Sequence, residues 1–89
     1  MQNNALGFLN AGNLRQMITA KFGSALREKR IEFGLTQEDL ARITGLNRSY
    51  ISDVELGKVG ISLERADKLA KAVNCKLKDL ISSEQENGQ

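Results

Sequence analysis

The chain of 89 residues contains no proline, no histidine and no tryptophan, and only 4% of its residues are aromatic. Without histidine, and with one cysteine, it lacks the side chains that most often hold metals or act as general bases. It also lacks a glycine-rich phosphate loop, so the sequence predicts a protein that is not an enzyme and holds no metal or cofactor. Proline, the strongest helix breaker, is absent, and no segment alternates apolar and polar residues with the period of a strand. We therefore expect an all-α fold.

The single cysteine and the absence of long apolar runs bear on where the protein works. Cys75 cannot form an internal disulfide, and a chain this short without one is typical of a reducing compartment. No apolar run approaches the roughly 18 residues of a membrane span. The N-terminal MQNNALGFLNAG has neither the basic start nor the long apolar core of a signal peptide. We expect a cytoplasmic protein with no membrane partner, in which Cys75 is a small buried hydrophobe rather than a redox sensor.

Charge is unevenly placed along the chain. Thirteen basic residues oppose eleven acidic ones, but Glu84 and Glu86 lie in the polar tail, so residues 1–82 carry a net charge of +4. A basic body is compatible with a nucleic-acid partner. The length allows one domain with a single modest core. We expect an N-terminal extension 1–17 that is helical or partly disordered, a domain 18–82 and a flexible tail 83–89.

Apolar spacing and capping residues predict a compact bundle of about five short helices. Apolar residues three and four apart run from position 14 to 33, where Gly34 offers a C-terminal stop. Three later helices each begin at a side chain that can cap them, namely Thr36, Asn47 and Ser62. Their predicted buried faces include Ile43 and Leu63, and a fifth helix around 77–81 precedes the tail.

The segment TQEDLARITGLNRSYISDVELGK, residues 36–58, places a helix end almost next to a helix start. Gly45 can adopt the left-handed conformation, which lets the chain turn within about three to four residues. So short a turn sets two helices steeply across each other, which is the pattern of a helix-turn-helix. The second helix, residues 47–56, exposes polar side chains at its N-terminal end that can read base edges in a major groove.

Residues 18–82 resemble the phage-repressor and Cro-like helix-turn-helix family, also called the xenobiotic-response-element type. The resemblance runs through FGSALREKRIEFGLTQEDLA, ITGLNRSYISDVELGK and ISLERADKLAKAVNCKLKDLI. The Thr-Gln helix start, the Leu-Ala pair, the turn glycine, the Ile-Ser step and the Glu-x-Gly ending occur in register. The stretch LNRSYIS is also similar to the controller proteins of restriction–modification systems. The resemblance implies a lambda-repressor-like domain that binds double-stranded DNA as a sequence-specific transcriptional regulator, acting as a homodimer on a two-fold symmetric operator.

The resemblance also implies which side chains meet DNA. The base-reading residues would be Arg48, Ser49, Ser52 and Asp53, and the backbone contacts would come from Gln37, Asn47, Tyr50 and Lys58. Arg48 is the first candidate because its planar fork fits O6 and N7 of guanine. Asp53 repels phosphate and accepts only from a base such as cytosine, so it excludes wrong sequences more than it attracts the right one. Alternatives stay open for Tyr50, whose ring could pack against the domain, and for the two serines, which could be neutral surface residues. Lys58 is expected to be a general electrostatic aid.

Two further roles concern structure and assembly. The family commonly pairs an arginine in a KRIEFG-like helix with the glutamate of the Glu-x-Gly ending, which implies an ion pair between Arg30 and Glu55. The last helix carries more apolar residues than so short a helix needs to anchor itself, so we expect it to form the dimer through Leu77, Leu80 and Ile81. The rival joint is the N-terminal extension, with Phe8 and Leu9.

A second class of function also stays open. The chain could be a protein-interaction module, for instance an antitoxin that holds a toxin and binds DNA for autoregulation. Residues 1–17 exceed what the family domain needs, and their apolar side chains could dock on such a partner. The plain alternative is a frayed tail with no partner.

Overall fold

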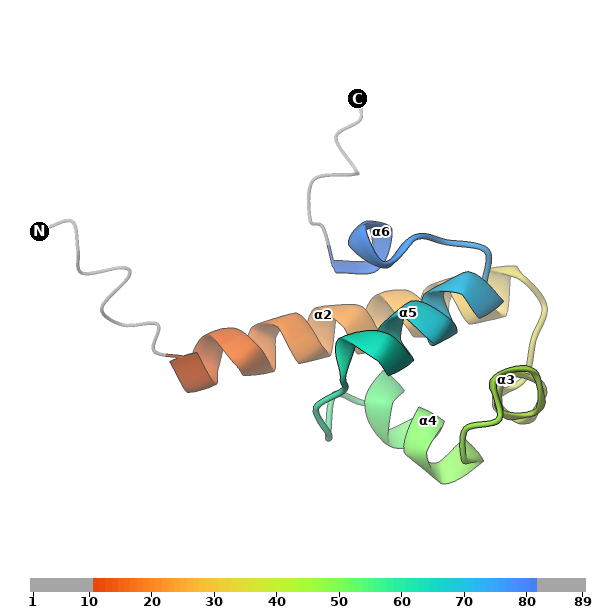
Figure 1. Cartoon of the computed structure of the whole chain (residues 1–89), viewed down its shortest axis with the longest axis horizontal. Coiled ribbons are helices and arrows are strands. Elements are labelled where there is room, and N and C mark those ends of the chain that lie inside the picture. Colours follow the sequence, from red (N-terminus) through yellow and green to blue (C-terminus); the bar gives the residue numbers. More distant parts are fainter. Residues whose placement is uncertain (1–10, 82–89) are drawn as a thin grey trace, which may run out of the picture.

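The computed structural model describes residues 11–81. Over this range it contains five helices and no strand, which confirms the predicted all-α class (Figure 1): α2 (Ala11–Glu32), α3 (Gln37–Thr44), α4 (Arg48–Glu55), α5 (Leu63–Ala72) and α6 (Leu77–Ile81). None of these helices is long and apolar enough to cross a membrane. Phe8, Leu9 and the tail 83–89 lie outside the described residues.

Helix α2 runs along the length of the molecule, and its N-terminal part extends beyond the other helices (Figure 1). It spans 22 residues, so the boundary predicted at residue 17 falls inside it. The helix ends where Gly34 adopts a φ of 78°, and the Leu35 N–H donates to the Arg30 carbonyl at 3.0 Å. This is the glycine stop that the sequence predicts.

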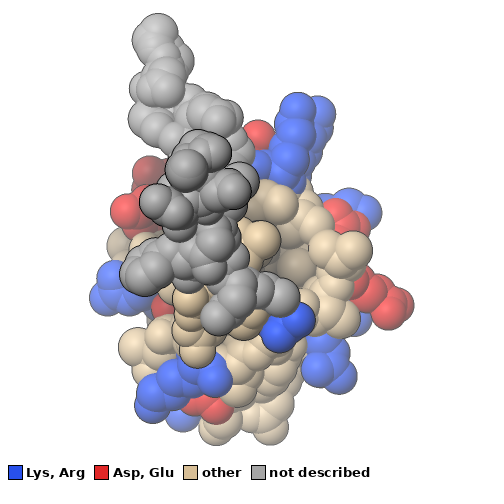
Figure 2. Space-filling model, turned by 90° about the vertical axis from the view of Figure 1, so that its left-hand side faces the viewer, with Lys and Arg blue, Asp and Glu red and all other residues tan. Residues whose placement is uncertain are grey.

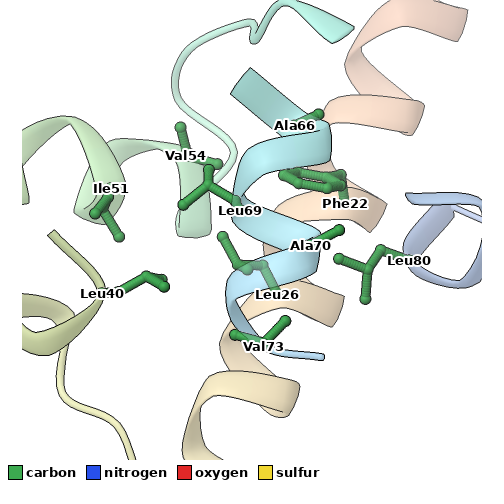
Figure 3. Close-up of a cluster of buried hydrophobic side chains, with 10 residues drawn as sticks. All are labelled: Phe22, Leu26, Leu40, Ile51, Val54, Ala66, Leu69, Ala70, Val73 and Leu80. Carbon is green, nitrogen blue, oxygen red and sulfur yellow. The ribbon is translucent and has the colours of Figure 1, made fainter. Parts of the chain in front are cut away.

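Every described helix contributes to one apolar core (Figure 3). Ten apolar side chains, each at most 4% exposed, point toward one another: Phe22, Leu26, Leu40, Ile51, Val54, Ala66, Leu69, Ala70, Val73 and Leu80. Helix α5 supplies three of them, and its C-cap supplies a fourth, because its apolar residues recur at helical spacing. The core therefore fixes how α3 and α4 stand against α2 and α5.

Three apolar residues lie elsewhere than the sequence predicts. Ile43 is 58% exposed because the buried side of α3 is set by Leu40 and Thr44, and Ile43 lies about 100° around the helix from Thr44. Leu63 is 77% exposed because it is the first residue of α5, one turn before the first buried residue. Leu80, predicted on a dimer-forming surface, is instead only 2% exposed because α6 packs against both α2 and α5. Leu80 is a core residue.

Gly23 allows α2 and α4 to approach closely. A Cβ atom at this position would overlap the carbonyl oxygen of Val54 and lie 3.1 Å from that of Glu55. The C-terminal end of α4 is therefore set directly against α2, whereas its N-terminal end points away from α2 (Figure 1). This arrangement leaves the start of α4 on the outside of the molecule.

Candidate nucleic-acid interface

A tight turn joins α3 to α4. Gly45 has φ 78° and ψ 7°, the left-handed conformation that glycine adopts without a steric cost, and its N–H donates to the Ala41 carbonyl at 2.8 Å. Two residues later Asn47 caps α4, because its side-chain Oδ1 accepts from the Ser49 N–H at 2.7 Å and from the Tyr50 N–H at 3.4 Å. The turn and the cap together form the helix-turn-helix that the sequence predicts.

The start of α3 is held by a reciprocal cap. Thr36 Oγ1 accepts from the Asp39 N–H, and Asp39 Oδ2 accepts from the Thr36 N–H, both at 2.9 Å. Asp39 Oδ1 also accepts from Arg42 Nη2 at 2.6 Å. The backbone hydrogen bond from Thr36, reinforced by Arg42, holds the pKa of the Asp39 carboxyl below its usual value. These hydrogen bonds therefore favour the ionised form of Asp39.

One side of α4 faces the solvent and the other faces the core. Ile51, Val54 and Glu55 are buried. The four predicted base-reading residues lie on the opposite side, because residues one and four positions apart are neighbours on a helix. Arg48 and Ser49 are exposed, and Ser52 and Asp53 are partly buried. The structure thus brings all four together on one surface, which we call the α4 outer face.

Tyr50 lies beside this face, with its side chain packed against the core. The guanidinium carbon of Arg65, on α5, lies 5.1 Å from the centre of the Tyr50 ring, a cation–π distance. This geometry supports the packed-ring alternative for Tyr50. The sequence did not indicate Arg65, because no local pattern shows that residues 15 apart are in contact. Lys58 is exposed in the loop after α4.

Arg30 and Glu55, predicted to pair, are in contact through a two-pronged ion pair. Arg30 Nε donates to Glu55 Oε2 at 2.7 Å, and Arg30 Nη2 donates to Glu55 Oε1 at 3.0 Å. The side chains are only 11% and 1% exposed. The hydrogen bonds to Glu55 raise the pKa of Arg30 further above its ordinary value. The ion pair ties the end of α2 to the end of α4. Arg30 Nη1 also donates to the Leu35 carbonyl at 2.8 Å, which ties α2 to the loop that precedes α3.

Gln37 links this ion pair to the α4 outer face. Its Nε2 donates to Glu55 Oε1 at 3.0 Å, and its Oε1 accepts from Arg48 Nη1 at 3.2 Å. An open polar hollow lies here at the N-terminal end of α3, lined by Arg30, Leu35, Thr36, Gln37, Glu38 and Arg48. The sequence indicates Gln37 only as a DNA-backbone contact, and no pattern in it signals the two internal contacts. The guanidinium donors of this hollow suit an anionic oxygen, whereas the Glu38 carboxylate in its lining opposes one.

Within residues 11–81, no group of three His, Cys, Asp or Glu side chains is placed to hold a metal ion. Cys75 is partly buried against the core, and its thiol is free. The polar chemistry described above therefore centres on the α4 outer face and on the hollow beside it.

The fold is thus a small helical domain built around a helix-turn-helix, and the second helix of this motif, α4, has one side exposed to solvent. A family model described as Helix-turn-helix matches residues 26–80. Control protein C.BamHI of Bacillus amyloliquefaciens is 39% identical over 61 residues, which cover 67% of this chain and 75% of that protein. The chain therefore belongs to the helix-turn-helix family of DNA-binding transcriptional regulators. This confirms the resemblance to Cro-like regulators and to controller proteins that the sequence indicates.

Two solved structures are similar in fold. The restriction–modification controller protein C.AhdI from Aeromonas hydrophila has a TM-score of 0.66 and 45% identity, covering 70% of this chain and 94% of that one. The controller protein C.Esp1396I, solved as a tetramer in complex with its natural 35 base-pair operator, has a TM-score of 0.64 and 27% identity. The match to C.Esp1396I covers 72% of this chain and 93% of that one.

Proposed function

We propose that this regulator binds a two-fold symmetric operator as a homodimer and reads the major groove with the α4 outer face. The observation that carries the proposal is the placement of Arg48 and Ser49 in the first turn of α4, exposed and directed away from the core. A recognition helix that enters a major groove contacts base edges with its N-terminal residues. C.Esp1396I, a relative in fold, was solved on its operator as a tetramer, which supports assembly of several copies on DNA.

Each predicted contact residue has a role in this proposal. Arg48 binds guanine through its free guanidinium edges, and Ser49, Ser52 and Asp53 read or exclude neighbouring bases. Gln37, Asn47 and Lys58 contact the DNA backbone, and of these three Gln37 lines the polar hollow. Tyr50 offers only its hydroxyl group, since its ring packs against the core. Residues 18–82 act as the DNA-binding unit.

The dimer joint in this proposal is an apolar groove of about 280 Å³ between α2 and α6. Its lining includes Ile18 from α2, Leu63 from α5 and Ile81 from α6, which are 46%, 77% and 39% exposed, and Leu77. Because Leu80 is used by the core, the exposed apolar area near α6 comes from these residues. Figure 2 views the molecule from the side to which α2 projects; outside the grey residues, uncharged residues make up much of the visible face, and charged side chains lie mostly toward its edge, with a basic one close to the centre. A two-fold interface buries the same apolar side chains on both subunits, so we place the interface at these exposed residues.

The antitoxin alternative is not retained. The relatives described above are controller proteins, and none of them is named as an antitoxin. The N-terminal extension, on which that alternative depended, lies largely outside the described residues.

Selection of bound sequences from a random DNA pool tests the proposed reading of DNA. We expect half-sites centred about 10–10.5 base pairs apart or a multiple of this, and a steep loss of affinity with salt. Arg48→Ala should weaken specific binding by about 1–3 kcal/mol and relax the preference at one base pair in each half-site. Lys58→Ala is the control, because it should weaken binding to all sequences alike. Recovery of an unchanged site with Arg48→Ala would show that the base-reading assignment is wrong.

Sedimentation analysis tests the dimer joint. We expect the pair Leu63→Ser and Ile81→Ser to convert the dimer to a monomer while leaving the fold intact, because both side chains are exposed in the isolated chain. Ile43→Ser is the matched control, since Ile43 is 58% exposed on another helix. A dimer that survives the groove changes and is lost on deletion of residues 1–10 would move the joint to the N-terminal extension.

A further inference from the structure

The buried carboxylate of Glu55 accepts one hydrogen bond more than its ion pair supplies. Its Oε1 atom accepts from both Arg30 Nη2 and Gln37 Nε2, each at 3.0 Å, and the side chain is 1% exposed. An ionised carboxylate has no proton to donate, whereas an amide has a donor end and an acceptor end. Gln37 must therefore turn its amide nitrogen toward Glu55. The chemistry of the buried partner fixes which way this amide points.

The opposite end of the same amide then faces α4. Gln37 Oε1 accepts from Arg48 Nη1 at 3.2 Å. A guanidinium group can only donate, so it matches a carbonyl oxygen and would be repelled by an amide nitrogen. The three groups therefore form a chain of hydrogen bonds in which the Gln37 amide has one favourable orientation: its nitrogen faces the Glu55 carboxylate and its oxygen faces the Arg48 guanidinium. The contacts join residues 18 and 11 positions apart in the chain.

Arg48 itself is exposed and carries a long side chain with several rotatable bonds. A side chain that is ordered only on binding reduces the affinity by the entropy lost, and one held beforehand avoids that loss. The bond to Gln37 uses one of the five guanidinium N–H groups, so four remain for a base.

We propose that Glu55, acting through Gln37, is a positioning residue that holds the Arg48 guanidinium in place before DNA arrives and so sharpens the preference for the base pair that Arg48 reads. The inference rests on the base-reading role of Arg48 proposed above. It gives Gln37 a specificity function in addition to its backbone contact. It also couples the buried ion pair to sequence preference.

The experiment uses Gln37→Met, which keeps the length of the side chain and removes both ends of the amide. The first readout is the order of the Arg48 Nε–H group in the free protein, measured by the heteronuclear ¹⁵N NOE. In the wild-type protein we expect a higher NOE for Arg48 than for Arg27, an exposed arginine of α2. In the Gln37→Met variant the NOE of Arg48 should fall to the value of Arg27. Equal values for Arg48 in both proteins would overturn the inference.

The second readout is discrimination between the selected operator and the same operator changed at the base pair that Arg48 reads. We expect Gln37→Met to reduce the ratio of the affinities for the two operators about 2- to 10-fold, which corresponds to the net contribution of one hydrogen bond. The same change in an Arg48→Ala background should not alter the ratio further. An equal loss of affinity for both operators would mean that Gln37 serves only as a backbone contact, and the inference would fall.

The two possible failures are distinguishable. If Arg48→Ala alone keeps the wild-type ratio, the proposed role of Arg48 is wrong and this inference falls with it. If Arg48→Ala lowers the ratio and Gln37→Met does not, the proposed function stands and only the positioning role is refuted. Melting curves of all variants control for loss of fold.

Discussion

Replacing Arg30 by methionine would leave the carboxylate of Glu55 buried without its charged partner. The methionine keeps most of the aliphatic stem of the arginine, so the packing around α2 changes little. What is lost is the two-pronged contact at 2.7 and 3.0 Å, after which Glu55 keeps only the hydrogen bond from Gln37. The carboxylate is 1% exposed, so water cannot replace the lost donors without local opening.

The expected cost follows from this burial. Removing one member of a buried ion pair destabilises a protein by about 3–5 kcal/mol, because the remaining charge is desolvated and unpaired. The whole free energy of unfolding of a small domain is only about 5–15 kcal/mol. The melting temperature should therefore fall by roughly 10 °C or more, since each kcal/mol shifts it by about 4–8 °C in a domain of this size. Glu55→Leu alone should also be strongly destabilising, because it leaves the Arg30 guanidinium, 11% exposed, without its partner.

The double variant is the decisive measurement. Arg30→Met with Glu55→Leu removes both charges, so its loss of unfolding free energy should be well below the sum of the single losses. Urea unfolding followed by circular dichroism gives the unfolding free energies of the wild type, the two single variants and the double variant. The exposed pair of Lys71 and Asp67, 3.0 Å apart and 74% and 46% exposed, is the control, and Lys71→Met should cost no more than about 0.5 kcal/mol. Losses that add within about 0.5 kcal/mol would refute the reasoning.

Three further predictions concern the scaffold of the site. Gly23→Ala should strongly lower the melting temperature, because the new Cβ would overlap the Val54 carbonyl, and an unchanged melting curve would mean that α2 and α4 are less closely packed. Leu69→Ala, at a position 0% exposed, should cost about 2–5 kcal/mol in urea unfolding. The pKa of Asp39 is lower in the folded than in the unfolded state, so its stabilising effect is present above the unfolded pKa of about 3.9 and is lost as the pH falls through the folded pKa. The stability difference between wild type and Asp39→Asn should thus be larger at pH 7 than at pH 2, and a difference independent of pH would contradict the cap with Thr36.

Local sequence determined where the helices begin and end. Thr36, Asn47 and Ser62 each cap a helix as predicted, and Gly45 makes the turn between α3 and α4. These signals are readable because a cap or a glycine stop acts on backbone groups within one helical turn. The polar spacing of α4 likewise predicted which of its sides faces the solvent, since one helix fixes that relation by itself.

Tertiary structure alone decided which apolar residues the core uses and how the site is supported. The periodicity of α6 marked Leu80 and Ile81 as apolar but could not say that one is 2% and the other 39% exposed. That difference depends on where α6 crosses α2 and α5. Gln37 likewise reaches Glu55 and Arg48 because Gly23 lets α4 sit against α2 and the turn brings α3 beside α4. Such contacts join residues far apart in sequence, and they exist only once packing has fixed the distances between helices.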